Sequence, residues 1–296
     1  MDKSLSVNDS ASLLTQTKKL LRRFGIRAKK GLGQHFLIDD AVLEKILDAA
    51  DLTPDDTVIE VGPGLGLMTA ELAKRAGWVI AIELDNKLAA ILEETLQVEN
   101  IVVLNEDVLG TDPAKLLKGS APHFPLQLRS YKVVANLPYY ITSPVLRHFL
   151  EAAVKPEVMV VMVQKEVANT IVADAGDRSM LSIAVQFYGK PGIVTDVPAV
   201  SFFPPPEVDS AVVKIDVYQK PPVAVTDVDR FFKLVRAGFS AARKQIINSL
   251  TQGLGLPKTE VQILLQETGI DPRRRAETFS LEEWAALFKE YCLMVK

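Results

Sequence analysis

The chain has 296 residues, of which 48% are hydrophobic and 24% are charged, and its formal net charge is −3. This length and apolar content suffice for one large hydrophobic core and a smaller one. The single cysteine, Cys292, excludes an internal disulfide and a multi-cysteine metal site, and the three scattered histidines have no metal-binding spacing. No apolar signal segment and no stretch of roughly 18 apolar residues occurs, so we expect a cytoplasmic protein.

Basic residues are segregated along the chain, although its net charge alone argues against a general nucleic-acid binder. Residues 17–30 and 230–250 contain several Lys and Arg residues and no acid, and residues 273–275 are all Arg. Any one cluster is more often a solvated helix face. Three together favour phosphate contacts on RNA, with the candidates Arg22, Arg23, Arg236, Arg243 and Lys244.

The predicted elements begin after a basic N-terminal extension, residues 1–28, that we expect to be partly disordered. Five apolar runs then alternate with helical patterns, which predicts a doubly wound, mainly parallel α/β sheet. These runs are residues 57–61, 78–82, 101–104, 132–135 and 158–163. Two later strands are predicted at residues 182–188 and 211–217, and the last is expected to be antiparallel because no long helix precedes it.

The character of the chain changes after residue 220. Helical patterns predict a small all-helical domain, with Thr278 or Ser280 as the N-cap of its last helix. They cover residues 227–250, 258–268 and 281–291. The sequence therefore predicts an extension at 1–28, a catalytic domain at 29–220 and a helical RNA-substrate domain at 221–296.

A glycine-rich turn, residues 62–66, follows the first predicted strand and precedes a helical pattern at residues 67–76. Strand, glycine turn and helix begin a nucleotide-binding unit. The next strand ends at Glu83, which can accept from both ribose hydroxyls, and the third ends just before Asp107, which can accept from an adenine amine. Both acids could instead be solvated loop residues, an alternative that is stronger for Asp107 than for Glu83.

The spacing of the glycines distinguishes between cofactors. A dinucleotide fingerprint requires G-x-G-x-x-G, whereas here the third glycine, Gly66, comes one residue early. No phosphate-binding G-x-x-x-x-G-K-[ST] sequence occurs, so NAD and ATP are both disfavoured. The E-x-G-x-G-x-G pattern of residues 60–66 resembles the first motif of S-adenosylmethionine-dependent methyltransferases.

The run Asn-Leu-Pro-Tyr at residues 136–139 ends a further apolar strand. The Asn136 side-chain oxygen can accept from an exocyclic amine, Pro138 fixes its own φ, and the Tyr139 ring can stack on a base. These are the needs of an enzyme that methylates adenine N6. Taken alone, a strand followed by a proline turn explains the run equally well.

Together these motifs resemble the rRNA adenine N6-dimethyltransferases over residues 29–287. The resemblance is carried in order by residues 33–37 (Gly-Gln-His-Phe-Leu), 60–66, Glu83, Asp107, 136–139 and 202–213. It is strongest to the bacterial small-subunit (16S) branch, which modifies two adjacent adenines of the 3′-terminal hairpin. Macrolide-resistance relatives usually have Ile at the position of Leu137. The family commonly has Asn at the position of His35.

The resemblance implies a Rossmann-like, S-adenosylmethionine-dependent catalytic domain that acts as a monomer, without metal or membrane, on rRNA of immature small subunits. It implies catalytic roles for Asn136, Leu137, Pro138, Tyr139 and Phe202, the last stacking on the flipped base. It implies cofactor contacts at Gln34, His35, Leu37, Glu60, Gly62, Gly64, Glu83, Leu84, Asp107, Val108 and Asn136. A DNA adenine methyltransferase and a non-catalytic ribosome-assembly factor are the alternatives.

Overall fold

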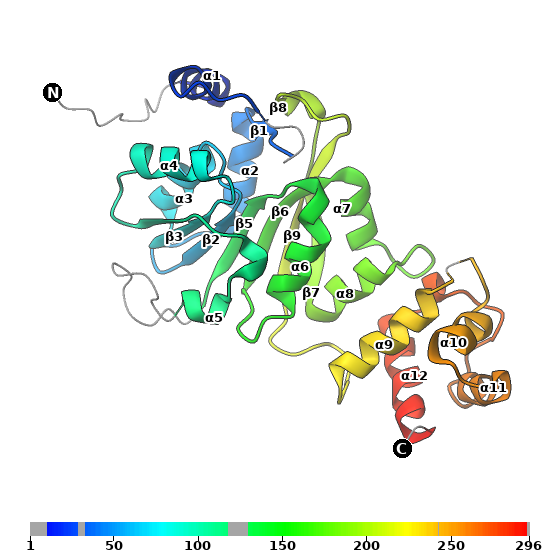
Figure 1. The fold of residues 1–296 in the computed structure, drawn as a ribbon. Coiled ribbons are helices and arrows are strands. Elements are labelled where there is room, and N and C mark those ends of the chain that lie inside the picture. The colour runs from blue at the N-terminus through cyan, green and yellow to red at the C-terminus, as the bar shows by residue number, and fades with distance from the viewer. Residues whose placement is uncertain (1–10, 29–32, 118–129, 242, 295–296) are drawn as a thin grey trace. The chain divides into compact units, whose positions relative to one another are not determined.

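The computed structural model describes residues 11–28, 33–117, 130–241 and 243–294. These residues form two compact units (Figure 1). The first comprises Met1–Ala168 and Gly192–Val217, and the second comprises Asn169–Pro191 and Tyr218–Lys296.

The first unit contains a seven-stranded sheet in the order β4-β3-β2-β5-β6-β9-β7. Strands β2 to β6 are parallel, and β9 runs antiparallel to β6, as the sequence predicted. The bounds are β2 Thr57–Val61, β3 Trp78–Ile82, β4 Ile101–Leu104, β5 Lys132–Asn136, β6 Val158–Gln164, β7 Gly189–Val197 and β9 Ser210–Val217. The edge strand β7 was not predicted.

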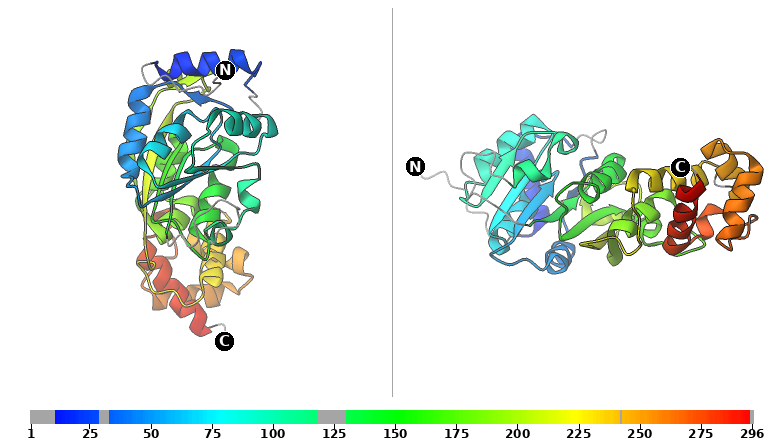
Figure 2. Two further views of the ribbon diagram at one scale, coloured as in Figure 1. Left: turned by 90° about the vertical axis from the view of Figure 1, so that its left-hand side faces the viewer. Right: turned by 90° about the horizontal axis from the view of Figure 1, so that it is seen from below.

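The apolar runs form strands because helices cover both faces of the sheet (Figure 2). Val58, Val79 and Val134 belong to a core shared with α2 and α3, while their neighbours in sequence are equally buried toward the other face. The helices of this part of the chain are α2 Asp40–Ala50, α3 Leu67–Arg75, α4 Asn86–Thr95, α5 Pro113–Leu116, α6 Thr142–Leu150 and α7 Lys165–Val172.

Helix α1, Leu13–Arg23, lies in the range expected to be a partly disordered extension and was not predicted. Leu13, Thr17 and Leu21 recur at helical spacing and are buried, and the Leu13 N–H donates to Asp40 Oδ1 over 3.2 Å. The opposite face is charged, so α1 is an amphipathic helix held against the first unit. The disorder expected for residues 1–10 lies outside the described residues.

A second, two-stranded sheet joins distant parts of the first unit. Strand β1, Phe36–Leu37, pairs antiparallel with β8, Phe202–Phe203, so that Phe36 faces Phe203 and Leu37 faces Phe202. This pairing brings the loop at residues 33–37 next to the late motif at residues 202–204.

The second unit is mainly helical, with a core that includes Phe187, Phe231, Trp284 and Phe288. Its helices are α8 Met180–Tyr188, α9 Val228–Phe239, α10 Ile246–Leu254, α11 Lys258–Glu267 and α12 Leu281–Met294. The predicted strand at residues 182–188 is wrong, because this run forms α8, which begins at a capping box on Ser179.

The structure also settles the number of helices at residues 227–250 and the N-cap of α12. The pattern at residues 227–250 is two helices, α9 and α10, rather than one. Ser280 caps α12, as predicted: its Oγ accepts from the Glu283 N–H over 3.2 Å, and Glu283 accepts in return from the Ser280 N–H over 2.8 Å.

Candidate active site

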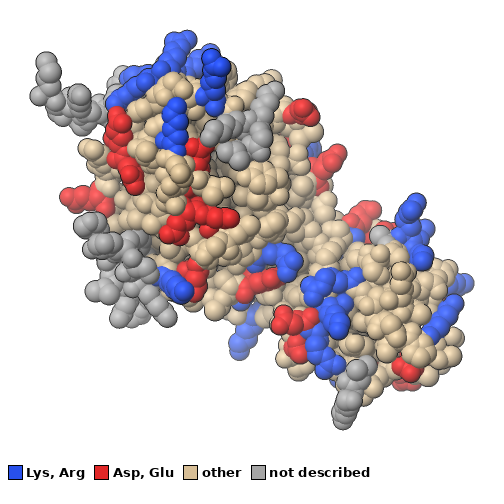
Figure 3. Space-filling view, viewed as in Figure 1, with Lys and Arg blue, Asp and Glu red and all other residues tan. Residues whose placement is uncertain are grey.

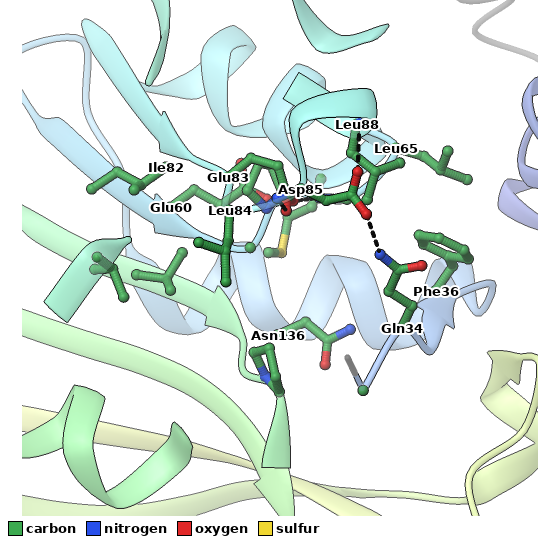
Figure 4. A pocket seen from close by; sticks show the side chains of 18 of the residues that line it. Gln34, Phe36, Glu60, Leu65, Ile82, Glu83, Leu84, Asp85, Leu88 and Asn136 are labelled. Atoms are coloured by element: carbon green, nitrogen blue, oxygen red, sulfur yellow. Dashed lines mark hydrogen bonds between the residues drawn. The ribbon is translucent and has the colours of Figure 1, made fainter. Parts of the chain in front are cut away.

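A pocket of about 1060 Å³, including its open mouth, lies at the carboxyl ends of β2, β3, β4 and β5 (Figure 4). Its walls come from the loop at residues 33–37 and from the segments that follow these four strands. The strands that follow β2 in sequence first extend the sheet on one side of it, as β3 and β4, and then on the other side, as β5 and β6. Open α/β sheets bind ligands at such a switch point.

The pocket is acidic. Among the residues that the structure describes, five carboxylic acids line it and no Lys or Arg does. The acids are Glu60, Glu83, Asp85, Glu106 and Asp107. Phosphate groups would be repelled here, whereas a ligand with cationic groups would be attracted. This charge pattern fits the sulfonium and ammonium of S-adenosylmethionine and disfavours a dinucleotide.

Both the backbone conformation of the turn and the packing of neighbouring side chains require glycine at two of its positions. Gly64 has φ of 62°, and a Cβ there would lie 3.1 Å from the Phe36 ring. Gly66 has φ of 77° at the N-cap of α3, and a Cβ there would lie 2.6 Å from Leu92. Other residues would therefore be strained at both positions, and the close approach of Phe36 shapes one wall of the pocket.

Glu83 lies at the end of β3 and is only 7% exposed. Its Oε2 accepts from the Gly64 N–H over 3.1 Å, and its Oε1 accepts from the Asp85 N–H over 2.9 Å. Burial raises the pKa of Glu83, and these backbone hydrogen bonds oppose the shift. The carboxylate is thus fixed in direction, with further lone pairs available for ligand hydroxyls.

Glu60 is fully buried in β2, and neither carboxylate oxygen has a hydrogen bond of normal geometry to any residue that the structure describes. Burial raises its pKa to about 8, an effect opposed by nearby Thr69 and increased by the charge of Glu83. Such an orphaned acid at the wall of a ligand pocket is costly unless a ligand satisfies it.

Asp107 follows β4 and is exposed at the pocket. One oxygen, Oδ1, accepts from the Leu109 N–H over 3.0 Å, which orients the side chain. Val108 is buried beside it, whereas Leu84 is 53% exposed on the neighbouring strand end. An acid between two apolar side chains can bind the edge of a planar base.

Two consecutive residues at the end of β5, Asn136 and Leu137, each carry an oxygen acceptor. The Asn136 Nδ2 donates to the His35 carbonyl over 3.0 Å, which leaves Oδ1 free to accept. The Leu137 N–H donates to the Met162 carbonyl, and the Leu137 carbonyl receives no hydrogen bond from any residue that the structure describes. Two unpaired acceptors next to each other can bind both hydrogens of an amino group.

Tyr139 is half-buried, and its hydroxyl lies 2.8 Å from Ser210 Oγ. Its ring stacks on His35 at a centroid distance of 6.1 Å and an interplanar angle of 18°. Burial raises the pKa of Tyr139, so the phenol stays neutral. Tyr140, which was not predicted, is 56% exposed at the pocket.

The structure brings all eleven expected cofactor residues, from Gln34 to Asn136, to this pocket, together with Pro138. Three other expected catalytic residues, Leu137, Tyr139 and Phe202, are not among the residues that line the pocket. The position of Phe202 also bears on its expected role. It is 2% exposed and packs in the core, so it presents no free face for the stacking expected of it, whereas adjacent Phe203 is half-buried. The placement of Phe202 therefore argues against that role.

Asp85 was missed as a pocket residue. It caps α4 by accepting from the Lys87 and Leu88 N–H groups, and its other oxygen lies 3.4 Å from Gln34 Nε2. Its position just before a helix after Glu83 was a recognisable N-cap signal. The role of Phe36 had no such signal, because only tertiary packing places its ring on the glycine turn.

The basic residues lie on exposed surfaces of each unit. In the first unit, Lys and Arg side chains gather over α1 (Figure 3), where Arg22 and Arg23 are exposed and Arg23 pairs with Glu94 at 2.9 Å. In the second unit, Arg236, Arg243 and Lys244 are exposed and have no acidic partner among the described residues.

The described residues contain neither a candidate membrane span nor a candidate metal site. No helix there is long and apolar enough to cross a membrane. Within the same residues, no group of three or more His, Cys, Asp and Glu side chains converges in a way that could hold a metal ion.

Solved structures resemble this chain over most of its length. A dimethyladenosine transferase from Plasmodium falciparum superposes with a TM-score of 0.71 at 26% identity, covering 88% of this chain and 98% of its own. The 23S rRNA methyltransferase ErmE superposes with a TM-score of 0.66 at 30% identity, covering 86% and 98%. The fold and the site define a Rossmann-like methyltransferase.

Curated relatives narrow this class. The chain is 53% identical to a ribosomal RNA small subunit methyltransferase A of Dehalococcoides mccartyi, covering 98% of this chain and 97% of the relative. It is 45% identical to that of Moorella thermoacetica, covering 94% and 98%. The family model of ribosomal RNA adenine dimethylase matches residues 25–292. The chain belongs to this family and is an S-adenosylmethionine-dependent rRNA adenine dimethyltransferase.

Proposed function

We propose that this chain dimethylates N6 of two adjacent adenines in the 3′-terminal hairpin of 16S rRNA, in the cytoplasm and as a monomer, during maturation of the small subunit. The pair of unpaired acceptors at Asn136 and Leu137, beside an acidic pocket, carries the proposal for the chemistry. The names of the curated relatives support the small subunit as substrate.

We expect different pocket residues to contact different parts of the cofactor. Glu83 would accept from the ribose hydroxyls and Asp107 from the adenine amine, with Leu84 and Val108 against the base. The orphaned Glu60, the turn at Gly62 and Gly64, and the loop residues Gln34, His35 and Leu37 would surround the methionine end. Bound there, S-adenosylmethionine supplies a methyl group on a positively charged sulfur.

The protein's task at the substrate is to hold the amine. The N6 lone pair is delocalised into the purine, so the nitrogen must become tetrahedral before it can attack. Asn136 Oδ1 and the Leu137 carbonyl would accept the two N6 hydrogens, which stabilises the developing positive charge without a strong base. Pro138, which has no N–H, leaves no competing donor beside these acceptors.

The target adenine must leave its stack to reach this site. One face of the Tyr139 ring packs on His35, and the other face would receive the base. Stacking of this kind contributes about 1–3 kcal/mol per base, which offsets much of the cost of unstacking. Arg22, Arg23, Arg236, Arg243 and Lys244 would contact phosphates and fix the register of the RNA.

Methylation of purified ribosomal particles tests the proposal. The full chain is incubated with methyl-labelled S-adenosylmethionine and undermethylated small subunits, and the rRNA is digested and mapped by mass spectrometry. We expect N6-dimethyladenine at two adjacent positions near the 3′ end. Label in large subunits or in duplex DNA instead would contradict the substrate, and no label in any nucleic acid would indicate an assembly factor.

Asn136→Ala tests the assigned chemistry. Loss of one acceptor should lower the single-turnover rate by about 100-fold or more while RNA binding changes little. Asn100→Ala is the matched control, because this amide lies just before β4 and donates to the Ala73 and Ala76 carbonyls, away from the pocket lining. Equal losses of rate and binding in Asn136→Ala would remove Asn136 from the chemistry.

A further inference from the structure

His35 lies where three distant segments of the first unit meet. Its carbonyl accepts from Asn136 Nδ2 over 3.0 Å, its ring Nδ1 lies 2.8 Å from the Pro204 carbonyl, and its ring stacks on Tyr139. Both the main chain and the side chain of this residue are therefore used, and the contacts reach two distant segments, the run at residues 136–139 and Pro204. Two of the three contacted residues belong to the proposed substrate site.

The contact with Pro204 determines which ring nitrogen carries a proton. A carbonyl oxygen only accepts hydrogen bonds, so Nδ1 must be the donor and the neutral ring must be the Nδ1–H tautomer. Together with the stack on Tyr139, this bond fixes both the direction and the plane of the imidazole. A ring anchored on two sides also restrains the main chain to which it is attached.

That restraint reaches Asn136. The Asn136 amide is oriented by the carbonyl of residue 35, and this carbonyl is held in place by the anchored ring. If the ring were lost, the carbonyl and the amide would gain freedom, and Oδ1 would point toward the substrate for only part of the time. Misplacement of a positioning group by about 1 Å can cost about 100-fold in rate.

We propose that His35 is a positioning residue: through its bond to Pro204 and its stack on Tyr139 it fixes the orientation of the Asn136 amide. The inference rests on the proposed roles of Asn136 and Tyr139. Asn at this position would keep part of the anchor, since Asn Nδ2 is separated from Cα by as many bonds as His Nδ1 and can donate to the same carbonyl. Asn cannot reproduce the stack.

The tautomer of His35 can be read directly from the full chain without cofactor or RNA. The sequence has three histidines, so a long-range ¹H–¹⁵N correlation spectrum is simple, and comparison with His35→Asn assigns the signal. We expect a protonated Nδ1 and, in the neutral ring, an unprotonated Nε2. A spectrum in which Nδ1 of His35 carries no proton overturns the proposal.

Kinetics test the consequence for Asn136. His35→Leu should lower the single-turnover rate by about 30-fold, whereas His35→Asn should stay within about threefold of wild type. Affinity for S-adenosylmethionine, measured by calorimetry, should fall much less than the rate in His35→Leu. Thermal unfolding of each variant checks the fold. His148→Leu, which removes a histidine from α6, is the matched control.

The outcomes separate this proposal from the proposed function. If cofactor affinity falls in parallel with the rate in His35→Leu, or if His35→Asn fails as His35→Leu does, the positioning role is wrong. If instead Asn136→Ala keeps its rate, the proposed chemistry at Asn136 fails, whatever the tautomer of His35. A large rate loss in Asn136→Ala together with rescue by His35→Asn supports both.

Discussion

The Gly64 N–H donates to Glu83 Oε2 across 3.1 Å, so the glycine turn after β2 and the acid at the end of β3 form one unit. The second oxygen, Oε1, holds the Asp85 N–H over 2.9 Å. Glu83 therefore shapes the turn as well as offering lone pairs to a ligand, and its replacement has two effects that must be separated.

Glu83→Gln should weaken S-adenosylmethionine binding by about 1.5–3 kcal/mol, because a charged acceptor is replaced by a neutral amide with one acceptor oxygen. Glu83→Ala should lose stability in addition, because the Gly64 and Asp85 N–H groups lose their partner. Calorimetry measures the first effect and denaturant unfolding the second. Glu99→Gln, an exposed acid before β4, is the control; unchanged affinity in Glu83→Gln would disprove the ribose contact.

Tyr139→Phe should cost about 1 kcal/mol of stability, because it leaves the buried Ser210 hydroxyl without its partner. Methylation should be retained, since the stacking face remains. The double variant with Ser210→Ala should recover part of the lost stability, which a double-mutant cycle in urea measures. Tyr139→Ala should instead raise the KM for RNA, and an unaltered KM would show that the ring does not receive the base.

The buried Glu60 should make the unfolding free energy of the chain depend on pH. Its pKa is about 8 in the folded chain against an ordinary value of 4.5, so folding favours the protonated form. The stabilisation is complete below the unfolded pKa and is lost as pH rises through the folded pKa. Without cofactor, wild type should lose stability relative to Glu60→Gln between about pH 4.5 and about pH 8, and the two curves should run parallel above that range. Curves that are parallel within it would contradict a buried, protonated Glu60, and Glu99→Gln should follow wild type.

Arg243→Glu with Lys244→Glu should weaken binding to small subunits and reduce its salt dependence, because each lost phosphate contact lowers the slope of log affinity against log salt by about one. Arg22→Glu tests α1 separately. Affinity for S-adenosylmethionine should not change. The control reverses Lys74 and Arg147, which already lie in ion pairs with Glu71 and Glu151. If the charge-reversal variants bind small subunits as tightly as wild type at both low and physiological salt, these basic clusters do not contact phosphates and are solvated surfaces.

The central strands were predictable because both of their faces are buried. Residues 57–61 and 78–82 are mostly apolar runs between turns, and each is a buried strand with those bounds. The edge strand at residues 101–104 is only partly buried, but its four residues are all apolar. The same property caused the error at residues 182–188. Ser182, Ile183, Ala184, Val185, Phe187 and Tyr188 are all buried, so the run shows no helical periodicity to reveal α8.

Strand β7 was missing from the sequence prediction for the opposite reason. It lies at the sheet edge, most of its residues are partly or fully exposed, and it contains Gly189, Pro191 and Gly192, which weaken any strand pattern. Helix α1 did carry a signal, because its buried residues recur every four positions, but the density of basic residues around them favoured an extension instead.

Glu83, Leu84, Asp107 and Val108 were accessible from sequence because they follow parallel strands, which end at one edge of the sheet. Gln34, His35 and Leu37 were expected only from the family resemblance. The contacts made by His35 were not accessible. Its partner Pro204 lies 169 residues away, and no local pattern indicates that a ring nitrogen will meet that carbonyl. For the same reason the burial of Phe202 could not be distinguished from the exposure that a stacking role requires.

The pairing of β1 with β8 also constrains the order of events during synthesis. Strands β2, β3 and β4, with the acids that follow them, are all made before residue 108, so the cofactor half of the pocket can assemble early. Phe36 and His35 are made earlier still, yet their partners Phe203 and Pro204 emerge from the ribosome almost a hundred residues later. A nascent chain can therefore hold the carboxyl ends of β2, β3 and β4 while the partners of Phe36 and His35 are still missing, so the contacts that join these distant segments must await the last third of translation.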